Sequence, residues 1–373
     1  MRILAIETSC DETALALLEA AGGLRTPRFK ILGNVISSQI EVHRPWGGVV
    51  PNLAKREHLK NLPIVLKEIM NQELGIRNKG SLIHNSKFLI PDVIAVTVGP
   101  GLEPALWTGV NFAKELYKDL RGKNKKLKLI GVNHLEGHLY SFLLAQKTEF
   151  PISNDQFSKR KSFPAIALIV SGGHTILLKM DSLIKWKKLG ETRDDAVGEA
   201  FDKVAKMLDL PYPGGPEIQR IAKRGDPHAI EFPRPMIHDK SYDFSYSGLK
   251  TSVLYYLRDH KEARPPAGSR ASQPLKPDIA ASFQEAALEV LVAKTVRAAK
   301  EYKAKSIFLS GGVAANTMLR QKLLTTSHSL HTQFLAPPMD FNTDNAVMIG
   351  VAGYISTLRK KNRHITAQAN LNL

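Results

Sequence analysis

Two histidines four residues apart are the side chains in this sequence whose spacing most directly suggests chemistry. His134 and His138 lie in the stretch 133–141, whose spacing otherwise predicts a helix. Residues i and i+4 of a helix share one face, so both imidazoles can reach a single metal ion. Two nitrogen ligands leave such a site incomplete. We therefore expect a carboxylate from elsewhere in the chain as the third ligand, a combination suited to Fe(II) or Zn.

A chance pair is the alternative interpretation of this spacing. The chain contains 12 histidines, and two of them fall four residues apart by chance fairly often. The segment also differs from the H-E-x-x-H motif of zinc peptidases, because Glu136 lies midway between the histidines. The metal hypothesis therefore depends on the rest of the chain.

Length and composition indicate a two-domain or internally duplicated protein. The chain has 373 residues, of which 43% are hydrophobic, and no apolar run approaches the roughly 20 residues of a membrane span. The opening MRILAIETSC predicts a strand rather than a signal or transit peptide. The single cysteine, Cys10, excludes an intrachain disulfide and fits a reducing cytoplasm. A buried thiol beside a strand is favoured there over a nucleophile.

The charge balance points to a polyanionic partner. Lysine and arginine number 52 against 35 acidic residues, a formal net charge of +17. Much of the excess lies in four runs, at residues 118–128, 159–161, 185–188 and 359–363. Each run alone is typical of a solvated face, but together they favour nucleic acid. Because no RNP, zinc-finger or KH signature is present, the charge predicts phosphate contacts and no sequence preference.

The chain also repeats a structural pattern. Residues 3–7 and 165–170 are apolar runs, and each is followed by a small polar turn and a second apolar run, as in a hairpin. Residues 92–101 and 306–312 each predict a strand that ends in a glycine turn before a helix. Strand-turn-helix units are common, but the same order occurring twice indicates two related α/β domains facing a cleft.

Glycine turns at the ends of these strands suggest a bound nucleotide. Backbone N–H groups at residues 171–173 and 310–312 can meet phosphate or carboxylate oxygens, although Gly-Gly also serves any tight turn. Asp11 and Glu12 add acidic groups to the first hairpin turn, and Asn316 follows the second glycine turn, where its amide can read a base or ribose.

Between the two halves, residues 190–206 predict an amphipathic helix that carries Asp202. The composition of residues 147–162 and 259–277 predicts two flexible insertions. The tail after Gly353 becomes basic and polar, which is typical of a chain end that frays.

Seven motifs taken together resemble one known family. In chain order they are IETSCDET, NHLEGH, VSGGHT, GEAFDKVAKMLDLPYPGGPEI, DFSYSGLKT, SGGVAAN and TDNAVMIG. They are similar to the motifs of TsaD-type tRNA adenosine threonylcarbamoyltransferases, a group formerly called O-sialoglycoprotein endopeptidases. The resemblance runs from Met1 to about Ala352. The bacterial form matches more closely, because the first histidine is followed by Leu-Glu-Gly and the chain shows no organellar leader.

This resemblance implies an actin-like (ASKHA) α/β fold with two duplicated domains around a substrate cleft. We expect an N-terminal subdomain at 1–125, with the segment from about 340 to 373 packing on it, and a C-terminal subdomain at 126–339. The implied reaction transfers the threonylcarbamoyl group of threonylcarbamoyl-adenylate to N6 of the adenosine adjacent to the anticodon, releasing AMP. The substrates implied are tRNAs reading codons that begin with A. The implied partners, in the cytoplasm and away from any membrane, are a non-catalytic actin-like paralogue and a small P-loop ATPase.

The resemblance also implies roles for particular residues. His134, His138 and Asp344 are implied as ligands of one Fe(2+) per subunit, with Zn as the alternative and no organic cofactor. Asp11 and Glu12 lie in the loop that the family uses near the reacting centre, where an acid can take or orient the proton of the attacking amine. The implied substrate-binding residues are Ile169, Val170, Ser171, Gly172, Gly173, Asp202, Gly215, Gln219 and Asn316. Gln219 departs from the family, which commonly has an aspartate there to accept hydrogen bonds from the ribose of the adenylate. No chemistry is predicted for the DFSYSGLKT motif.

Three alternatives belong to other functional classes. A metallopeptidase needs a base beside the metal, and Glu136 would point away from the face shared by the histidines. A sugar-kinase-like ATPase or phosphotransferase of the same fold would leave the histidine pair unexplained. A non-catalytic scaffold paralogue lacks the histidine pair, which is intact here.

Overall fold

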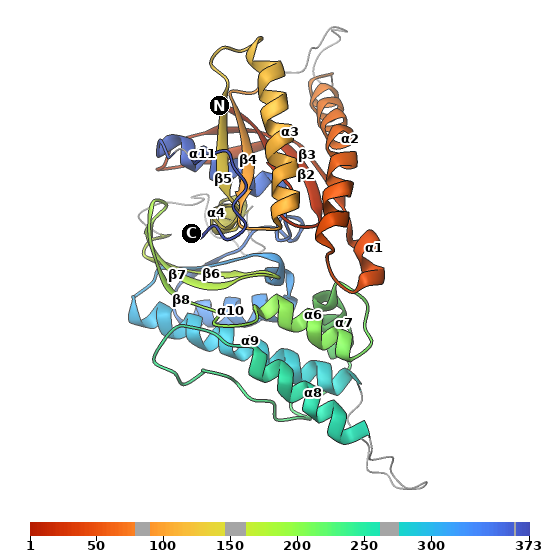
Figure 1. Cartoon of the computed structure of the whole chain (residues 1–373). Helices are drawn as coiled ribbons and strands as arrows, with labels where there is room; N and C mark the ends of the chain where they lie inside the picture. The colour runs from red at the N-terminus through yellow and green to blue at the C-terminus, as the bar shows by residue number, and fades with distance from the viewer. Residues whose placement is uncertain (79–89, 146–161, 262–275, 362) are drawn as a thin grey trace. The chain divides into compact units, whose positions relative to one another are not determined.

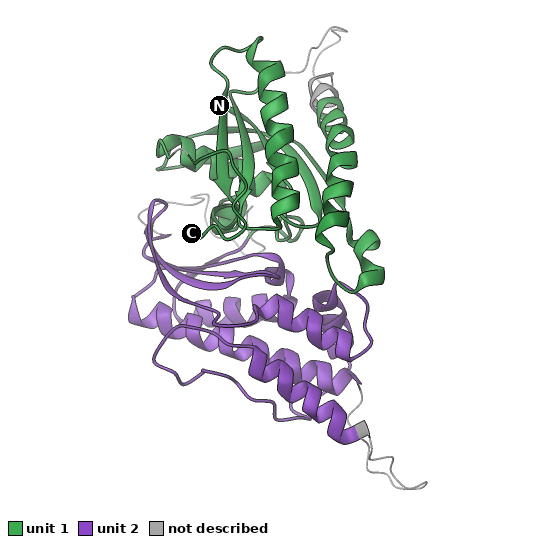
Figure 2. Ribbon diagram, in the orientation of Figure 1, with its two compact units in different colours: residues 1–159, 337–373 green, residues 160–336 purple. Residues whose placement is uncertain are grey.

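The computed structural model describes residues 1–78, 90–145, 162–261, 276–361 and 363–373 (Figure 1). The chain forms two compact units, unit 1 at Met1–Lys159 and Pro337–Leu373 and unit 2 at Arg160–Ala336 (Figure 2). The predicted domain limits at 125/126 and 339/340 stay a prediction. Most of the two expected insertions lies outside the described residues. The described parts are Ser162 of the first insertion and residues 259–261 and 276–277 of the second, which end one helix and begin the next.

Unit 1 contains a five-stranded mixed sheet with the strand order β3-β2-β1-β4-β5. Its strands are β1 (Arg2–Glu7), β2 (Glu12–Ala21), β3 (Arg28–Ser38), β4 (Val93–Gly99) and β5 (Lys128–Asn133). β2 pairs antiparallel with both β1 and β3, whereas β4 pairs parallel with both β1 and β5. The apolar runs of β1 and β4 are almost wholly buried, as expected for central strands covered on both faces.

Helices cover both faces of this sheet. They are α1 (Ile40–His43), η1 (Arg44–Trp46), α2 (Pro51–Asn78), α3 (Glu103–Arg121), α4 (His134–Tyr140), η2 (Ser141–Leu144), η4 (Met339–Phe341) and α11 (Ala346–Leu358). Apolar residues of α2 and α3 pack with Leu4 and Ile94. On the opposite face, α11 lies close to the sheet, and a Cβ on Gly353 would be 2.9 Å from that of Ala95. Every residue of α11 from Ala346 to Ser356 is buried.

Unit 2 repeats the same topology. Its strands are β6 (Ala165–Val170), β7 (Thr175–Ser182), β8 (Lys185–Glu191), β9 (Ser306–Ser310) and β10 (Gln333–Leu335), in the order β10-β9-β6-β7-β8. β7 pairs antiparallel with both β6 and β8, and β9 pairs parallel with both β6 and β10. Each strand thus has a counterpart in unit 1, which confirms the α/β class and the predicted repeat.

The helices of unit 2 enclose a second hydrophobic core. They are α6 (Val197–Met207), α7 (Gly214–Ala222), α8 (Ser247–Lys261), α9 (Lys276–Glu301), η3 (Gly312–Ala315) and α10 (Thr317–Ser329). Phe201 of α6 and Phe283 of α9 meet edge to face, with ring centroids 5.0 Å apart. None of the helices that the structure describes is long and apolar enough to cross a membrane.

The C-terminal tail does not fray as its composition suggested. The Gln368 amide donates to the Val98 carbonyl at 2.7 Å, and the Gly101 amide donates to the Ala369 carbonyl at 3.1 Å. Val98 and Gly101 lie where β4 ends and its backbone groups need partners, and the tail supplies them. The last residues are therefore part of unit 1.

Candidate functional site

The two histidines of the sequence motif begin and nearly end a short helix. β5 ends at Asn133, whose side-chain oxygen accepts from the backbone amides of Leu135 at 2.8 Å and Glu136 at 3.2 Å, and so caps α4. One helical turn then separates His134 from His138, whose ring centroids are 4.7 Å apart. Both side chains are buried, as the shared-face argument requires.

Asp344 reaches these histidines because α11 packs closely on α4. A Cβ on Gly137 would lie 3.0 Å from Ile349 and 3.1 Å from Met348 of α11, so the missing side chain allows this approach. Asp344 immediately precedes the capping residue of α11. Its Oδ1 atom is 3.4 Å from His134 Nε2 and 3.1 Å from His138 Nε2.

These three side chains form an arrangement that fits a metal ion. One ligand atom from each of His134, His138 and Asp344 lies within 4.8 Å of the others. Although His138 Nε2 is close to Asp344, neither ring nitrogen of His138 makes a regular hydrogen bond among the described residues. A buried, unsatisfied nitrogen beside a second imidazole and a carboxylate is the donor set that a divalent cation completes.

Glu7 fixes the orientation of His134. Glu7 is fully buried at the end of β1, and its Oε2 lies 3.2 Å from His134 Nδ1. Thr97 donates to the same oxygen at 2.6 Å, and the Ser9 hydroxyl lies 3.1 Å from His134 Nδ1. With Nδ1–H donated to the carboxylate, Nε2 is the nitrogen that faces the ligand set. Sequence reasoning missed Glu7, although a carboxylate that ends a buried apolar strand is itself an available signal.

The electrostatics of the site favour a cation. Burial lowers the pKa of His134, but the charges of Asp344 and Glu7 overcome that effect and raise it to about 9. Burial lowers the pKa of His138. Without metal, a protonated His134 therefore faces the carboxylates of Asp344 and Glu7, and a bound cation would take the place of its Nε2 proton.

Asp11 and Glu12 lie where β1 turns into β2. Asp11 is buried, and burial together with the charges of Asp11 and Asp344 raises the pKa of Glu12 well above its usual range. This electrostatic influence links Glu12 to the ligand set within unit 1. Burial and the charge of Asp11 also raise the pKa of the Cys10 thiol, which agrees with an inert cysteine.

A buried polar network behind this loop was not predicted. His58 of α2 donates from Nε2 to the Cys10 carbonyl at 3.0 Å, and its Nδ1 lies 2.8 Å from the Thr13 hydroxyl. Gln39 joins His58 to His43, whose Nε2 lies 3.1 Å from the Gln39 side-chain oxygen. The Cys10 carbonyl can only accept a hydrogen bond, so neutral His58 carries its proton on Nε2 and its Nδ1 accepts.

In unit 2, the predicted cradle surrounds the end of β6. Ile169 and Val170 end the strand, and the Ser171 hydroxyl accepts from the His174 amide at 3.1 Å to close the turn. No atom lies within 4 Å of a Cβ built on Gly172 or Gly173, so the turn presents open backbone. The neighbouring turn after β9 comes close to this strand end through Gly311, where a Cβ would meet the Val170 carbonyl oxygen at 2.2 Å.

The remaining predicted substrate residues lie in α6 and α7 and at the N-cap of α10, in unit 2. Asp202 accepts from the Gly214 amide at 2.7 Å, where α7 begins, and a Cβ on Gly215 would have no neighbour within 4 Å. The Asn316 side-chain oxygen caps α10, and its amide nitrogen donates to Gln284 at 2.8 Å. Its expected contact with a base or ribose therefore competes with bonds already made, and stays a prediction.

Gln219 also has an internal partner. Its side-chain oxygen accepts from the Thr317 amide at 2.6 Å and lies 3.1 Å from the Thr317 hydroxyl. The residue therefore ties α7 to the start of α10. The side-chain amide nitrogen of Gln219 takes no part in these two contacts, and it can only donate a hydrogen bond.

The DFSYSGLKT motif has a structural role in unit 2. The Asp194 carboxylate accepts from the hydroxyls of Ser245 at 2.5 Å and Ser247 at 2.7 Å, and from the Tyr246 amide at 2.8 Å. It therefore caps α8 from a distant part of the chain. Lys250 of the same motif adds an ion pair to Asp195 at 2.6 Å, which further ties α8 to this segment.

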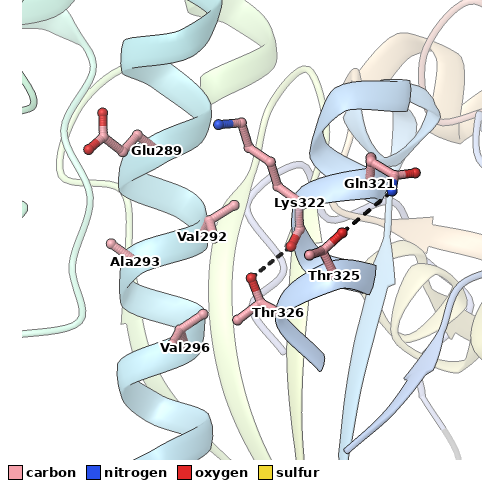
Figure 3. A pocket seen from close by; sticks show the side chains of 8 residues that line it. All are labelled: Glu289, Val292, Ala293, Val296, Gln321, Lys322, Thr325 and Thr326. Carbon is pink, nitrogen blue, oxygen red and sulfur yellow. Dashed lines mark hydrogen bonds between the residues drawn. The ribbon is translucent and has the colours of Figure 1, made fainter. Parts of the chain in front are cut away.

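A groove between α9 and α10 is separate from these residues (Figure 3). Its volume is about 520 Å³, and none of the predicted site residues lines it. The lining residues are Glu289, Val292, Ala293, Val296, Gln321, Lys322, Thr325 and Thr326.

The basic runs differ in their surroundings. Lys125, Lys126 and Lys128 are exposed, as are Lys185 and Lys187, and residues 159–161 lie outside the described residues. The run at 359–363 does not match the solvated face expected of it, because three of its cations surround the buried Glu136. A buried carboxylate requires such counter-charge, and this run supplies it.

Comparisons with known proteins identify the family of this chain. A family model described as "TsaD: tRNA N6-adenosine threonylcarbamoyltransferase" matches residues 30–351. Two proteins of that name, from Thermosipho africanus and Clostridioides difficile, are 46% and 42% identical to this chain. The first alignment covers 95% of this chain and 94% of the relative, and the second covers 99% and 97%.

Solved structures support the fold alone. A full-length HypF matches with a TM-score of 0.52 at 12% identity, over 98% of this chain and 47% of that one. HypF from T. kodakarensis matches with a TM-score of 0.51 at 14% identity, over 97% and 49% of the two chains. The predicted actin-like fold is confirmed. The chain belongs to the TsaD family of tRNA N6-adenosine threonylcarbamoyltransferases, and it is a transferase of tRNA modification.

Proposed function

We propose that this enzyme transfers the threonylcarbamoyl group of threonylcarbamoyl-adenylate to N6 of the adenosine adjacent to the anticodon. The substrates would be tRNAs reading codons that begin with A. In the reaction, a C–N bond forms between the carbamoyl carbon and N6, and the bond from that carbon to the phosphate oxygen breaks. AMP leaves with the electron pair. The observation that carries the proposal is the convergence of His134, His138 and Asp344 in a chain of this family.

The proposed cofactor is one Fe(2+), with Zn as the alternative, held by His134, His138 and Asp344. Mixed imidazole and carboxylate donors fit either metal. When bound, the cation would hold the threonyl carboxylate or the phosphate of the substrate and polarise the carbamoyl carbonyl. Glu7 keeps the Nε2 atom of His134 available for this purpose, through its contact with Nδ1.

We assign proton transfer to the loop of Asp11 and Glu12. The attacking amine must lose a proton as the new bond forms, and Glu12 is the proposed acceptor. Burial and the neighbouring acids raise its pKa, so that Glu12 in its ionised form is a stronger base than an ordinary carboxylate. Asp11 lies beside it and contributes to that shift.

Unit 2 is proposed to bind the adenylate. Open backbone at Gly172, Gly173 and Gly215 supports close approach by phosphate or ribose oxygens. The full proposed set is Ile169, Val170, Ser171, Gly172, Gly173, Asp202, Gly215, Gln219 and Asn316. We further propose that exposed lysines contact the tRNA backbone and that a non-catalytic actin-like paralogue and a small P-loop ATPase assist. The tRNA substrate supports a cytoplasmic location.

The alternatives have less support. A metallopeptidase would use Glu136 as its base, but that carboxylate contacts Lys361 at 2.9 Å and Arg363 at 3.0 Å. A sugar-kinase-like phosphotransferase would leave the histidine pair without a role.

A transfer assay with defined components tests the proposal. Purified protein, with and without the two partner proteins, is given threonylcarbamoyl-adenylate and an anticodon stem-loop with adenosine beside the anticodon. We expect AMP release and a modified adenosine, and loss of both in His134→Ala, His138→Ala and Asp344→Ala. His238→Ala, which removes an exposed histidine, is the matched control. Full transfer by the metal-free triad variants would refute the proposed site, and no transfer by the wild-type protein with its partners would refute the reaction.

A further inference from the structure

Glu136 lies between the two histidines in sequence, and its surroundings are unusual for a carboxylate. The side chain is fully buried. Its Oε1 atom lies 2.9 Å from Lys361 Nζ, 3.0 Å from an Arg363 guanidinium nitrogen and 4.0 Å from one of Arg359. Three cations from the end of the chain therefore converge on one oxygen of the helix that carries His134 and His138.

The chain beyond these cations continues across unit 1. We call residues 359–361 and 363–373 the C-terminal strap. Its backbone bonds to the end of β4 through Val98 and Gly101. A Cβ on Gly99 would lie only 1.9 Å from the Gln368 carbonyl oxygen, so a glycine is needed for the strap to pass. Ile365 and Leu371 of the strap pack against the core of this unit.

The strap also holds the start of α4. The Asn133 side-chain amide donates to the Asn372 carbonyl at 2.9 Å, while its oxygen caps the helix. The strap thus contacts the residue before His134 and the residue midway between the two histidines. α4 has seven residues, too few to be stable by itself. Its position must be set by contacts outside the helix.

We propose that Glu136 is a positioning residue for metal binding, through which the C-terminal strap holds α4 so that His134 and His138 share one ion. The strap gives α4 fixed partners at Asn133 and at Glu136. This inference rests on the proposed metal site and assigns a role to the basic end of the chain. An ordinary buried ion pair would stabilise unit 1 without affecting metal affinity, and this difference makes the two roles separable.

Cobalt binding to the full-length protein tests the inference. Co(II) is titrated into metal-free protein, and its visible absorption and its competition with a chelator give the affinity. Glu136→Gln and the double variant Lys361→Gln/Arg363→Gln should bind Co(II) at least about tenfold more weakly, as other residues that orient ligands do. Their absorption bands should also shift. The double variant leaves α4 unaltered and serves if Glu136→Gln does not fold.

Lys360→Gln is the matched control, since Lys360 is exposed in the same run and should leave Co(II) affinity unchanged. Thermal unfolding of each metal-free variant is measured in parallel. Unchanged Co(II) affinity and spectrum in both Glu136→Gln and Lys361→Gln/Arg363→Gln, whatever their melting temperatures, would overturn the positioning role while leaving the metal site intact. Absence of Co(II) binding by the wild-type protein would overturn the metal site and this inference together.

Discussion

Glu7 Oε2 lies 3.2 Å from His134 Nδ1, although Glu7 ends β1 and His134 follows β5, the first and last strands of this sheet in the sequence. The carboxylate at the end of the central strand β1 thereby holds the imidazole at the start of α4. Thr97, from the neighbouring strand β4, donates to the same oxygen at 2.6 Å. Two adjacent strands therefore fix the ring through one acceptor. This relationship decides which His134 nitrogen can bind an ion.

Replacing Glu7 should weaken metal binding without removing a ligand. In Glu7→Gln the side chain can donate as well as accept, so it no longer selects the Nδ1–H tautomer of His134. We expect metal affinity to fall by roughly 10- to 100-fold. Titration of metal-free protein with Fe(II) under anaerobic conditions, or with Co(II), measures the change. Glu19→Gln, a partly exposed glutamate paired with Arg2, should have no effect. Equal affinities for Glu7→Gln and wild type would show that His134 is oriented by other contacts.

The sequence predicted those parts of the site that depend on local spacing. His134 and His138 share a face because of helical geometry, and the hairpin and glycine-turn patterns correctly indicated the repeated α/β units. Asp344 came from the family resemblance, because nothing local connects it to α4. The contact of Glu136 with Lys361 and Arg363 could not be predicted, because these partners lie 225 and 227 residues away in the sequence. A basic run has the same pattern whether it meets tRNA or a buried carboxylate.

The exposed lysines near the start of β5 give a prediction for tRNA binding. If Lys125, Lys126 and Lys128 contact phosphates, each lost contact should lower the slope of log affinity against log salt by about one unit. Changing all three to glutamine should therefore weaken tRNA binding and reduce the slope by up to about three units. Filter binding or fluorescence anisotropy across a salt series measures it.

Affinity for threonylcarbamoyl-adenylate is the internal control for the triple lysine variant and should not change. A second control is the variant with Lys185 and Lys187 changed to glutamine, which tests the other exposed run. An unaltered salt slope in the first variant and a reduced one in the second would move the tRNA contact from unit 1 to unit 2.

The network around His58 predicts a pH dependence of stability. Burial lowers the pKa values of both His58 and His43 below the ordinary 6.5. The unfolded chain therefore binds more protons than the folded one in the window just below pH 6.5, and stability falls as pH decreases through it. The contribution is fully present above pH 6.5. Protonated His58 can no longer accept the Thr13 hydrogen bond.

Urea unfolding from about pH 7.5 to pH 5 measures this effect. Wild type should lose stability with falling pH more steeply than His58→Gln/His43→Gln, which cannot take up these protons. His331→Gln, in unit 2 and away from the network, should follow the wild-type curve. Parallel curves for wild type and the double variant would show that the two histidines do not carry the dependence.

Gln219 gives a final prediction in which stability and substrate binding are measured separately. Its side-chain oxygen is already bonded to Thr317 at the start of α10, so a shorter aspartate would have to leave that partner to reach a ribose. Gln219→Glu keeps the reach and adds a negative charge at a helix N-terminus, which should stabilise the fold. Its second carboxylate oxygen can accept from a ribose hydroxyl. A charged acceptor is worth about 1 kcal/mol more than a neutral one, so adenylate binding should tighten by roughly fivefold. Gln219→Ala should weaken both properties modestly. If calorimetry shows stability changing in these variants while adenylate affinity stays constant, Gln219 links two helices and does not contact the ribose.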